Sequence, residues 1–283
     1  MNGKKLFAAL VTLTILSTII GAINYNSAEN QIAAAAPIEM SAQTASISCI
    51  NPTSKEESAT CANMEAQILA VTIRIELHTW ATFGGHHKTI TTKSHATILE
   101  GKYLVTHNHY KYSLTEQVEE YGEVKGYTGI SLRTTRGRLL IENAPLNSFS
   151  IVYEDPATLV FAFEDENGNG LFESSNLLSG QFADLNDIPL AAGVELAQID
   201  WDGETAHVDW VMVDNLNLTD DVPQLQVNNF PKKGCSGGGV FWNGIHIGNN
   251  WAKNIEEDQA TDEITRRYSI IALNTSAVVD LDQ

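Results

Sequence analysis

The chain has 283 residues, a formal net charge of −18 and a 43 % share of hydrophobic residues. This composition suits a globular core, and the length allows one large domain or two small ones. The acidic balance argues against a nucleic-acid partner, because phosphate binding requires clustered Lys and Arg.

The first segment has the pattern of an export signal. Two lysines in MNGKK precede an uncharged apolar run from Leu6 to Ile23, and small residues near Ala28 offer cleavage points. The pattern predicts a signal peptide or signal anchor over residues 1–27. We expect the rest of the chain to be secreted or otherwise extracytoplasmic, with membrane anchorage through residues 6–23 if the segment is kept. A buried core helix is the alternative.

Residues 28–65 are rich in Ala, Ser, Thr and Asn and show little apolar periodicity, so we expect a polar, loosely ordered segment. Cys49 and Cys61 lie in it, 12 positions apart. In an exported protein this pair predicts a disulfide that closes a small loop. Cys235, the third cysteine, stays unpaired, and no Cys/His zinc spacing is found.

From residue 66 onward the pattern is that of short strands. Alternating stretches rich in β-branched residues occupy 67–80, 89–107, 127–135, 138–144, 148–154, 158–164, 194–202, 205–214, 239–248 and 268–278. Turn signals separate many of them, at Glu100-Gly101-Lys102, Asn169-Gly170, Asp202-Gly203 and Asn243-Gly244. No long amphipathic helix is evident. Many short strands with frequent turns predict an all-β sandwich or barrel.

Negative charge is concentrated in the middle of the chain. Between Arg138 and Lys232 there is no Lys or Arg, whereas 17 Asp and Glu residues fall there. A solvated acidic surface is one interpretation. A site for Ca²⁺ or another cation that offsets the repulsion is the other.

The loop DENGNGLFE echoes the calcium pattern D-x-N-x-N-G, with Asp165, Asn167 and Asn169 as candidate oxygen ligands. The Glu expected at the twelfth position is missing, because that residue is Asn176. An ordinary Asn-Gly hairpin is the alternative.

The stretch GCSGGG places Ser236 among glycines. Serine is a weak nucleophile and needs a base, an orienting carboxylate and N–H donors aimed at the developing oxyanion. A glycine-rich turn supplies such donors, because glycine adopts strained dihedrals and approaches a substrate closely. Ser236 is therefore a candidate nucleophile, with the N–H groups of Gly234 and Ser236 as the oxyanion hole. A glycine-rich hairpin without catalytic function would look similar.

Two further residues complete the pattern. His109 follows a strand that ends in Val-Thr, and Asp155 stands at the head of another strand, so the order is His109, Asp155, Ser236. His107 competes with His109 as the base. Glu154 is adjacent to Asp155 but would face the other side of a strand.

These motifs resemble those of the chymotrypsin-like (trypsin-fold) serine proteases over about residues 66–280. The matching residues are Val105, Thr106 and His109, then Asp155, Ala157 and Leu159, then Gly234, Ser236, Gly237 and Gly238. The resemblance implies an all-β fold of two Greek-key six-stranded β-barrels within residues 66–283. The barrels would cover about 66–165 and 175–283, with a Ser-His-Asp active site between them.

The chain departs from the family at three positions. Cys235 replaces the aspartate that receives the new N-terminus in trypsin-like zymogens, and a thiol cannot form that ion pair. Gly239 replaces the usual proline, and Pro156 after the aspartate is unusual. A reactive thiol at Cys235 is an alternative, although viral relatives with a cysteine nucleophile place it where Ser236 stands.

The stretch GIHIG, Gly244 to Gly248, resembles a pocket motif of glutamyl endopeptidases and of viral cysteine proteases that prefer Glu or Gln. In this interpretation His246 and Gly248 bind the substrate, and the imidazole reads a carboxylate or amide before the scissile bond. A histidine facing the core is the alternative.

Together these features predict an exported serine endopeptidase whose substrate is a protein or peptide. No cofactor is required, and Ca²⁺ is the one candidate ion. A catalytically inactive trypsin-fold binding protein is the first alternative, and an all-β adhesion domain is another.

Overall fold

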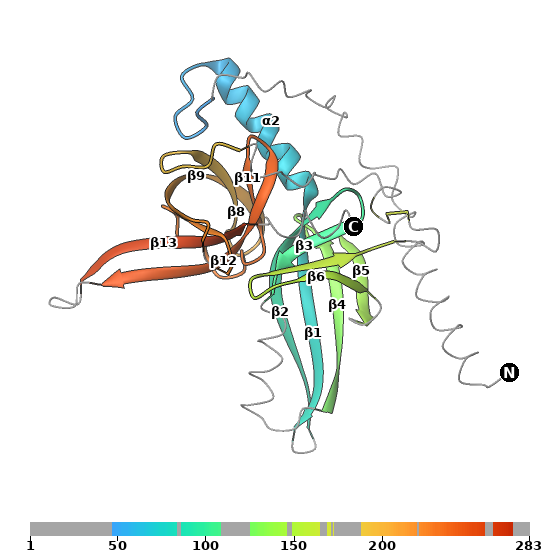
Figure 1. Cartoon of the computed structure of the whole chain (residues 1–283). Helices are drawn as coiled ribbons and strands as arrows, with labels where there is room; N and C mark the ends of the chain where they lie inside the picture. The colour runs from blue at the N-terminus through green and yellow to red at the C-terminus, as the bar shows by residue number, and fades with distance from the viewer. Residues whose placement is uncertain are drawn as a thin grey trace.

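A computed structural model describes most of the chain from residue 47 onward (Figure 1). The described residues are 47–83, 86–108, 125–145, 149–164, 169–170, 172, 188–219, 221–257 and 263–273. The expected signal segment over residues 1–27 lies outside them.

One helix, α2 (Lys55–Val71), precedes the first strand. The Ser54 hydroxyl accepts the N–H of Glu57, and the Glu57 carboxylate accepts the N–H and hydroxyl of Thr53. These reciprocal bonds satisfy donors that the start of a helix leaves open. The prediction of a loosely ordered segment is therefore wrong from Lys55 to residue 65, and that of a strand from Gln67 is wrong up to Val71. No helix in the described part of the chain is long and apolar enough to cross a membrane.

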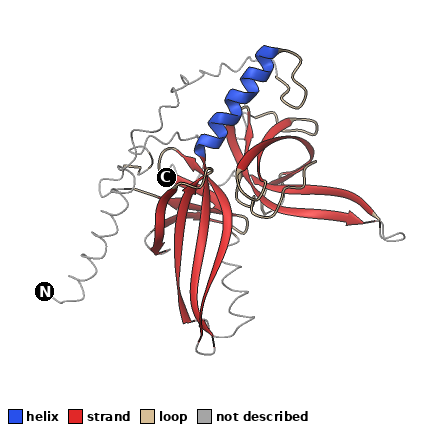
Figure 2. Cartoon of the chain, turned by 180° about the vertical axis from the view of Figure 1, so that it is seen from behind, coloured by secondary structure: helices blue, strands red, loops and turns tan. Residues whose placement is uncertain are grey.

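The helix joins the two β units of the protein. Its buried Ile68 and Val71 pack in one cluster with Trp201 and Phe241 of the second unit. The next residue after the helix, Thr72, already belongs to the first strand of the first unit. Figure 2 shows the end of α2 running directly into that sheet.

The predicted disulfide between Cys49 and Cys61 is confirmed. It ties the segment before α2 to the second turn of the helix. The carboxylate of Glu195 accepts the N–H groups of Cys49 and Ile50 and the hydroxyl of Ser48. The segment is thereby fixed to the start of a strand in the second unit.

The first unit is a seven-stranded antiparallel sheet with the order β5-β4-β1-β2-β3-β7-β6. Its strands are β1 (Thr72–Phe83), β2 (His86–Leu99), β3 (Tyr103–His107), β4 (Lys125–Thr134), β5 (Leu139–Pro145), β6 (Ser150–Glu154) and β7 (Thr158–Ala162). Glu100 and Gly101 have φ of 52° and 69°, as the predicted turn between β2 and β3 requires. Its curved face encloses a core of Ile, Leu and Phe side chains.

The second unit is a closed barrel with the order β10-β13-β12-β11-β8-β9. Its strands are β8 (Glu195–Trp201), β9 (Ala206–Asn217), β10 (Gln224–Val227), β11 (Gly239–Trp242), β12 (Ile245–Glu257) and β13 (Ile264–Leu273). The predicted turn at Asn243-Gly244 joins β11 to β12 with φ of 47° and 82°. A separate aliphatic cluster fills this barrel.

The predicted all-β fold of two β units is confirmed, with a difference in the first unit. The second unit is the expected six-stranded closed barrel, whereas the first is a partly closed sheet of seven strands. In the described part of the sheet, β5 pairs only with β4 and β6 only with β7. The two edge strands therefore do not close the sheet.

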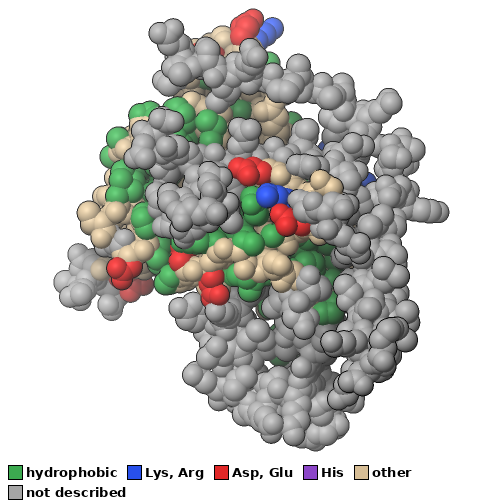
Figure 3. All heavy atoms as spheres, turned by 45° about the vertical axis from the view of Figure 1, so that its right-hand side comes forward, with side chains coloured by type: hydrophobic (Ala, Val, Ile, Leu, Met, Phe, Trp, Pro, Cys, Tyr) green, Lys and Arg blue, Asp and Glu red, His purple; other side chains and the backbone are tan. Residues whose placement is uncertain are grey.

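Charged side chains are mostly at the surface. The face in Figure 3 carries carboxylates in several separate places among hydrophobic and polar groups. Glu76 is a buried exception that bonds Arg74 and Arg133. Burial alone would raise the pKa of Glu76, but hydrogen bonds from the two guanidinium groups outweigh it, so the pKa lies below its usual value.

Candidate active site

The glycine-rich turn lies between β10 and β11, and its N–H groups fall into two kinds. The N–H of Gly237 donates to the Asn250 carbonyl at 2.8 Å, and that of Gly238 donates to the Cys235 carbonyl at 2.9 Å. Among the described residues, the N–H groups of Gly234 and Ser236 meet no acceptor. These are the two N–H groups that the sequence assigns to the oxyanion hole.

The turn requires glycine at two positions for different reasons. Gly234 has φ of 110° and Gly237 has φ of 76°, which is the left-handed region that other residues avoid. A Cβ on Gly237 would also lie 2.3 Å from the Thr106 hydroxyl and 2.4 Å from the His95 carbonyl. The turn can therefore approach β2 and β3 of the first unit only because residue 237 has no side chain.

A backbone hydrogen bond joins the serine to the first unit. The N–H of His95, on β2, donates to the carbonyl of Ser236 at 2.9 Å. The Thr106 hydroxyl, on β3, donates to the His95 carbonyl at 2.7 Å. Ser236 is thus held beside the strand that ends two residues before His109.

His95 is a residue of this site that the sequence motifs do not identify. One ring nitrogen, Nδ1, lies 2.8 Å from the Gly234 carbonyl, and the ring packs 5.2 Å from that of Trp201. Burial lowers the pKa of His95 to about 4, although the bond to Gly234 opposes the shift. The neutral ring therefore donates from Nδ1 and orients the candidate oxyanion turn. A histidine in the centre of the β-branched stretch 89–99 is the only sequence signal for it.

The end of β3 is tied to the turn that carries Asp155. His107 pairs with Thr158 on β7, and the Asn108 N–H donates to the Ala157 carbonyl at 2.9 Å. The Asn108 side chain donates to the Asp155 carbonyl at 2.6 Å. The structure thus brings the residue before His109 to Asp155. His109 itself lies outside the described residues.

The Asp155 carboxylate already has local partners. Its Oδ1 accepts the N–H groups of Ala157 and Thr158 at 2.7 and 2.6 Å, and its Oδ2 accepts the Tyr153 hydroxyl at 2.8 Å. A carboxylate has about four acceptor positions, so one more donor can be accommodated. The role of Asp155 in a triad stays a prediction.

Cys235 and His246 are both buried. Burial, followed by the charge of Asp200, raises the pKa of the Cys235 thiol to about 12, which argues against a reactive thiol. Burial also lowers the pKa of His246 to about 4, and its Nε2 lies 3.3 Å from the Asn249 amide oxygen. Gly248 allows close approach of β13, since a Cβ there would lie 2.3 Å from the Ala272 carbonyl. Substrate contacts of His246 and Gly248 stay predictions.

A pocket of about 480 Å³ lies beside the candidate site. Pro156, next to Asp155, lines one side, and Trp251, next to Asn250, lines another. The remaining lining residues are Thr219, Asp221, Val222 and Gln224 of the second unit. The pocket is thus an open depression between the residue after Asp155 and the second unit.

The candidate Ca²⁺ loop falls mostly outside the described residues. Asp165 and Asn167 lie outside them, and Asn169 alone is described. The Ca²⁺ site stays a prediction. Elsewhere in the described chain, Asp200, His207 and Asp209 place their ligand atoms within 4.8 Å of one another.

No protein-family model and no curated protein sequence matches the chain. Among solved structures, the chain is similar to two structures of one protease. The active form of the Rv3671c protease from M. tuberculosis has a TM-score of 0.48 and 12 % identity, covering 85 % of this chain and 92 % of that chain. The inactive form has a TM-score of 0.46 and 10 % identity, covering 80 % and 94 %.

Proposed function

We propose that the protein is an exported serine endopeptidase in which Ser236 is the nucleophile, His109 the base and Asp155 the orienting carboxylate. One observation carries the proposal. Within the glycine turn, the N–H groups of Gly234 and Ser236 meet no acceptor among the described residues, while those of Gly237 and Gly238 are engaged. Two open donors, one of them the N–H of the serine itself, are what stabilisation of a tetrahedral oxyanion requires.

In this mechanism His109 takes the proton from the Ser236 hydroxyl as the oxygen attacks a peptide carbonyl. The resulting oxyanion accepts the two open N–H groups, and the proton passes from His109 to the leaving amine. Water then releases the acyl group from Ser236 by the same steps in reverse order. The bonds from His95 to Ser236 and Gly234 keep the turn in place throughout.

A fluorophosphonate probe tests the proposal directly. We expect the folded wild-type protein to be labelled, Ser236→Ala to be unlabelled, and Ser150→Ala, at an exposed serine on β6, to be labelled as the wild type is. Equal melting temperatures of the three proteins would show that Ser236→Ala is folded. Wild-type protein that is folded yet unlabelled, or labelling that persists in Ser236→Ala, would refute the nucleophile.

The proposal includes a preference for Glu or Gln before the scissile bond. The Lys253 ammonium donates to the Pro231 carbonyl at 3.3 Å, in the segment that leads into the serine turn. Lys253 and Arg267 also flank the Phe230 ring, at 4.6 and 5.7 Å. Two cations near the serine turn of an acidic protein favour an anionic side chain of the substrate.

Peptides that differ only before the scissile bond test this preference. We expect Glu to give the highest kcat/KM, Gln a lower value, and Lys or Arg the lowest. Lys253→Met should reduce the advantage of Glu over Gln, whereas Lys55→Met, on the distant helix, should not. A preference for basic or large apolar residues would contradict this part of the proposal.

Two further parts of the proposal rest on residues that, apart from Asn169, lie outside the described chain. One is export with a signal peptide or anchor. N-terminal sequencing of extracytoplasmic protein tests it: loss of residues 1–27 indicates a signal peptide, and their retention indicates an anchor. The other is Ca²⁺ binding at Asp165, Asn167 and Asn169. Calcium added after EDTA treatment should raise the melting temperature, and Asp165→Asn should abolish that rise.

An inactive binding protein is the second candidate function, and the Asp155 turn favours it. Both oxygens of the Asp155 carboxylate accept bonds from residues within three positions in the chain. In that case the carboxylate only stabilises the turn. Absence of labelling in folded protein would support this function.

A further inference from the structure

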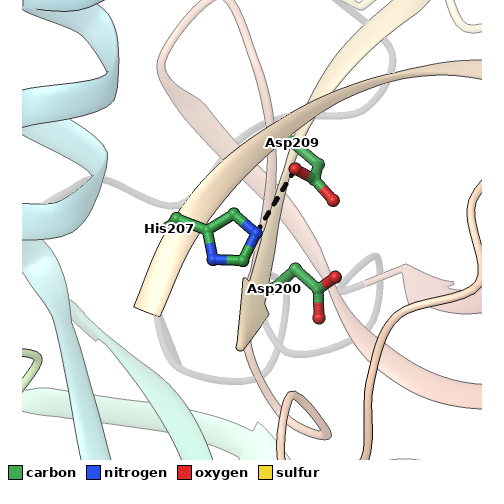
Figure 4. Close-up of side chains that lie close together, drawn as sticks. All are labelled: Asp200, His207 and Asp209. Atoms are coloured by element: carbon green, nitrogen blue, oxygen red, sulfur yellow. Dashed lines mark ion pairs between the residues drawn. The ribbon is translucent and has the colours of Figure 1, made fainter. Parts of the chain in front are cut away.

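Three side chains that can bind a metal lie together on one hairpin of the barrel (Figure 4). Asp200 is on β8, and His207, its direct partner on β9, stands opposite. Asp209 lies two residues further along β9, so it points to the same face as His207. One ligand atom from each residue lies within 4.8 Å of the other two.

Protein donors orient both carboxylates. Oδ1 of Asp200 accepts the N–H groups of Trp201 and Lys232 at 2.6 and 3.0 Å. Oδ2 of Asp209 accepts the Asn229 side-chain amide at 3.2 Å, and its Oδ1 faces His207 Nε2 at 3.5 Å. The second oxygen of Asp200 accepts no bond from the described residues, whereas Oδ1 of Asp209 is paired with His207. Such outer hydrogen bonds are typical of metal ligands in proteins.

Asp200 is a largely buried residue, and its carboxylate has no cationic partner among the described residues. Asp200 is 6 % exposed, and among the described residues no Lys or Arg pairs with it and no donor reaches its second oxygen. The chain has no Lys or Arg at all from residue 139 to residue 231. A buried carboxylate is costly unless a cation or several hydrogen bonds compensate it. The side chains of His207 and Asp209 are 42 % and 37 % exposed, which leaves a route for an ion from solvent.

We propose that Asp200, His207 and Asp209 bind a divalent transition-metal ion such as Zn²⁺. One imidazole and two carboxylates form an N/O ligand set of the kind that suits Zn²⁺ or Mn²⁺ better than Ca²⁺, which takes oxygen ligands. Three protein ligands leave further positions for water. Binding would replace the contact between His207 Nε2 and Asp209 Oδ1 and would draw the three ligand atoms, now within 4.8 Å of one another, closer together.

The site is connected to the turn that carries Ser236. Asn229 and Lys232, which bond the two carboxylates, belong to the segment that leads into that turn. Trp201, next to Asp200, packs its ring on Gly234, where a Cβ would lie 3.0 Å from it. A bound ion would therefore stabilise the segment Asn229–Gly234. Metal binding itself does not depend on Ser236 being a nucleophile.

Direct metal binding by the full chain tests the proposal. After EDTA treatment and removal of the chelator, Zn²⁺ is titrated by calorimetry and Co²⁺ by visible absorption. We expect one ion to bind the wild type. Asp209→Asn and His207→Gln should weaken binding by at least about 10-fold, because each replaces a carboxylate or imidazole ligand by a weakly coordinating amide. Asp202→Asn, at an exposed carboxylate in the turn of the same hairpin, is the matched control and should bind as the wild type does.

Melting temperatures measured without metal show whether each variant is folded. We expect Asp209→Asn and His207→Gln to fold, because the new side chains are similar in size to the original ones. Zn²⁺ should raise the melting temperature of the wild type and of Asp202→Asn, but not that of His207→Gln. Absence of Zn²⁺ and Co²⁺ binding to the wild type would overturn the proposal. Binding that is equal in all four proteins would place the ion elsewhere and overturn it as well. Neither result would affect fluorophosphonate labelling of Ser236.

Discussion

Replacement of Gly237 by Ala tests whether the glycine turn positions Ser236 by close contact with the first unit. The new Cβ would lie 2.3 Å from the Thr106 hydroxyl and 2.4 Å from the His95 carbonyl. The turn would have to retreat by about 1 Å to reach ordinary contact distances. That shift would break the bonds of Ser236 and Gly237 to His95 and Asn250, which are 2.9 and 2.8 Å long.

The expected loss of stability is the sum of two effects. A non-glycine residue in the left-handed region costs about 1–2 kcal/mol, and each lost hydrogen bond costs about 1 kcal/mol. Gly237→Ala should therefore lower the free energy of unfolding by roughly 3–4 kcal/mol. Gly137→Ala is the matched control, because Gly137 has φ of 83° and no atom within 4 Å of the new Cβ. It should cost only the backbone contribution.

Urea unfolding at neutral pH measures both variants, and the rate of fluorophosphonate labelling measures the placement of Ser236. We expect Gly237→Ala to be the less stable variant by about 2 kcal/mol and to be labelled far more slowly than Gly137→Ala. Equal losses of stability would show that the turn tolerates a side chain at this contact, and the argument that glycine positions Ser236 would then be refuted.

Three further predictions concern stability. His95 and His246 have their pKa values lowered from 6.5 to about 4, so the unfolded chain binds more protons below pH 6.5. Each histidine should therefore lower the free energy of unfolding at pH 5 by about 2 kcal/mol relative to its value above pH 7. A urea midpoint that is unchanged from pH 7.5 to pH 5 would contradict this. Cys49→Ser opens the loop to Cys61 and should cost about 3 kcal/mol, measured by urea unfolding; reduction of the wild type should match it. Glu76→Gln leaves two guanidinium groups near a neutral amide and should lower the free energy of unfolding by about 2 kcal/mol, because the arginine side chains are partly exposed and solvent screens the charges. A loss below about 0.5 kcal/mol, measured by urea unfolding, would contradict this.

The strands and their turns were predictable because they depend on local patterns. Alternation of apolar and polar residues identifies strands such as β8 and β9, and dipeptides such as Asn243-Gly244 identify tight hairpins. Helix α2 shows the limit of this approach. Its C-terminal half is rich in Ile, Leu and Val, which also suits a strand, and the capping pair Ser54 and Glu57 was the signal that distinguishes the two.

The candidate site was predictable only in part. The glycine turn has a sequence signature, because its backbone conformation permits few other residues. The contribution of His95 has no motif, only the presence of a histidine within a β-branched stretch, since its contacts with Gly234 and Ser236 join residues about 140 positions apart. The group formed by Asp200, His207 and Asp209 has only a weak sequence signature. The register of β8 and β9 decides which of these residues share a face, and local sequence patterns do not determine that register.

The placement of Ser236 depends on backbone atoms more than on side chains. Its carbonyl is bonded to the first unit through His95, and the next residue is bonded to β12 of the barrel through Asn250. A side-chain contact can adjust by rotation, but these two bonds fix the turn to both β units at once. Any relative movement of the sheet and the barrel would therefore displace Ser236 and the two open N–H groups together. For this reason the contact between the units is part of the candidate active site, and substitutions at Gly237 or His95 should alter reactivity before they unfold either unit.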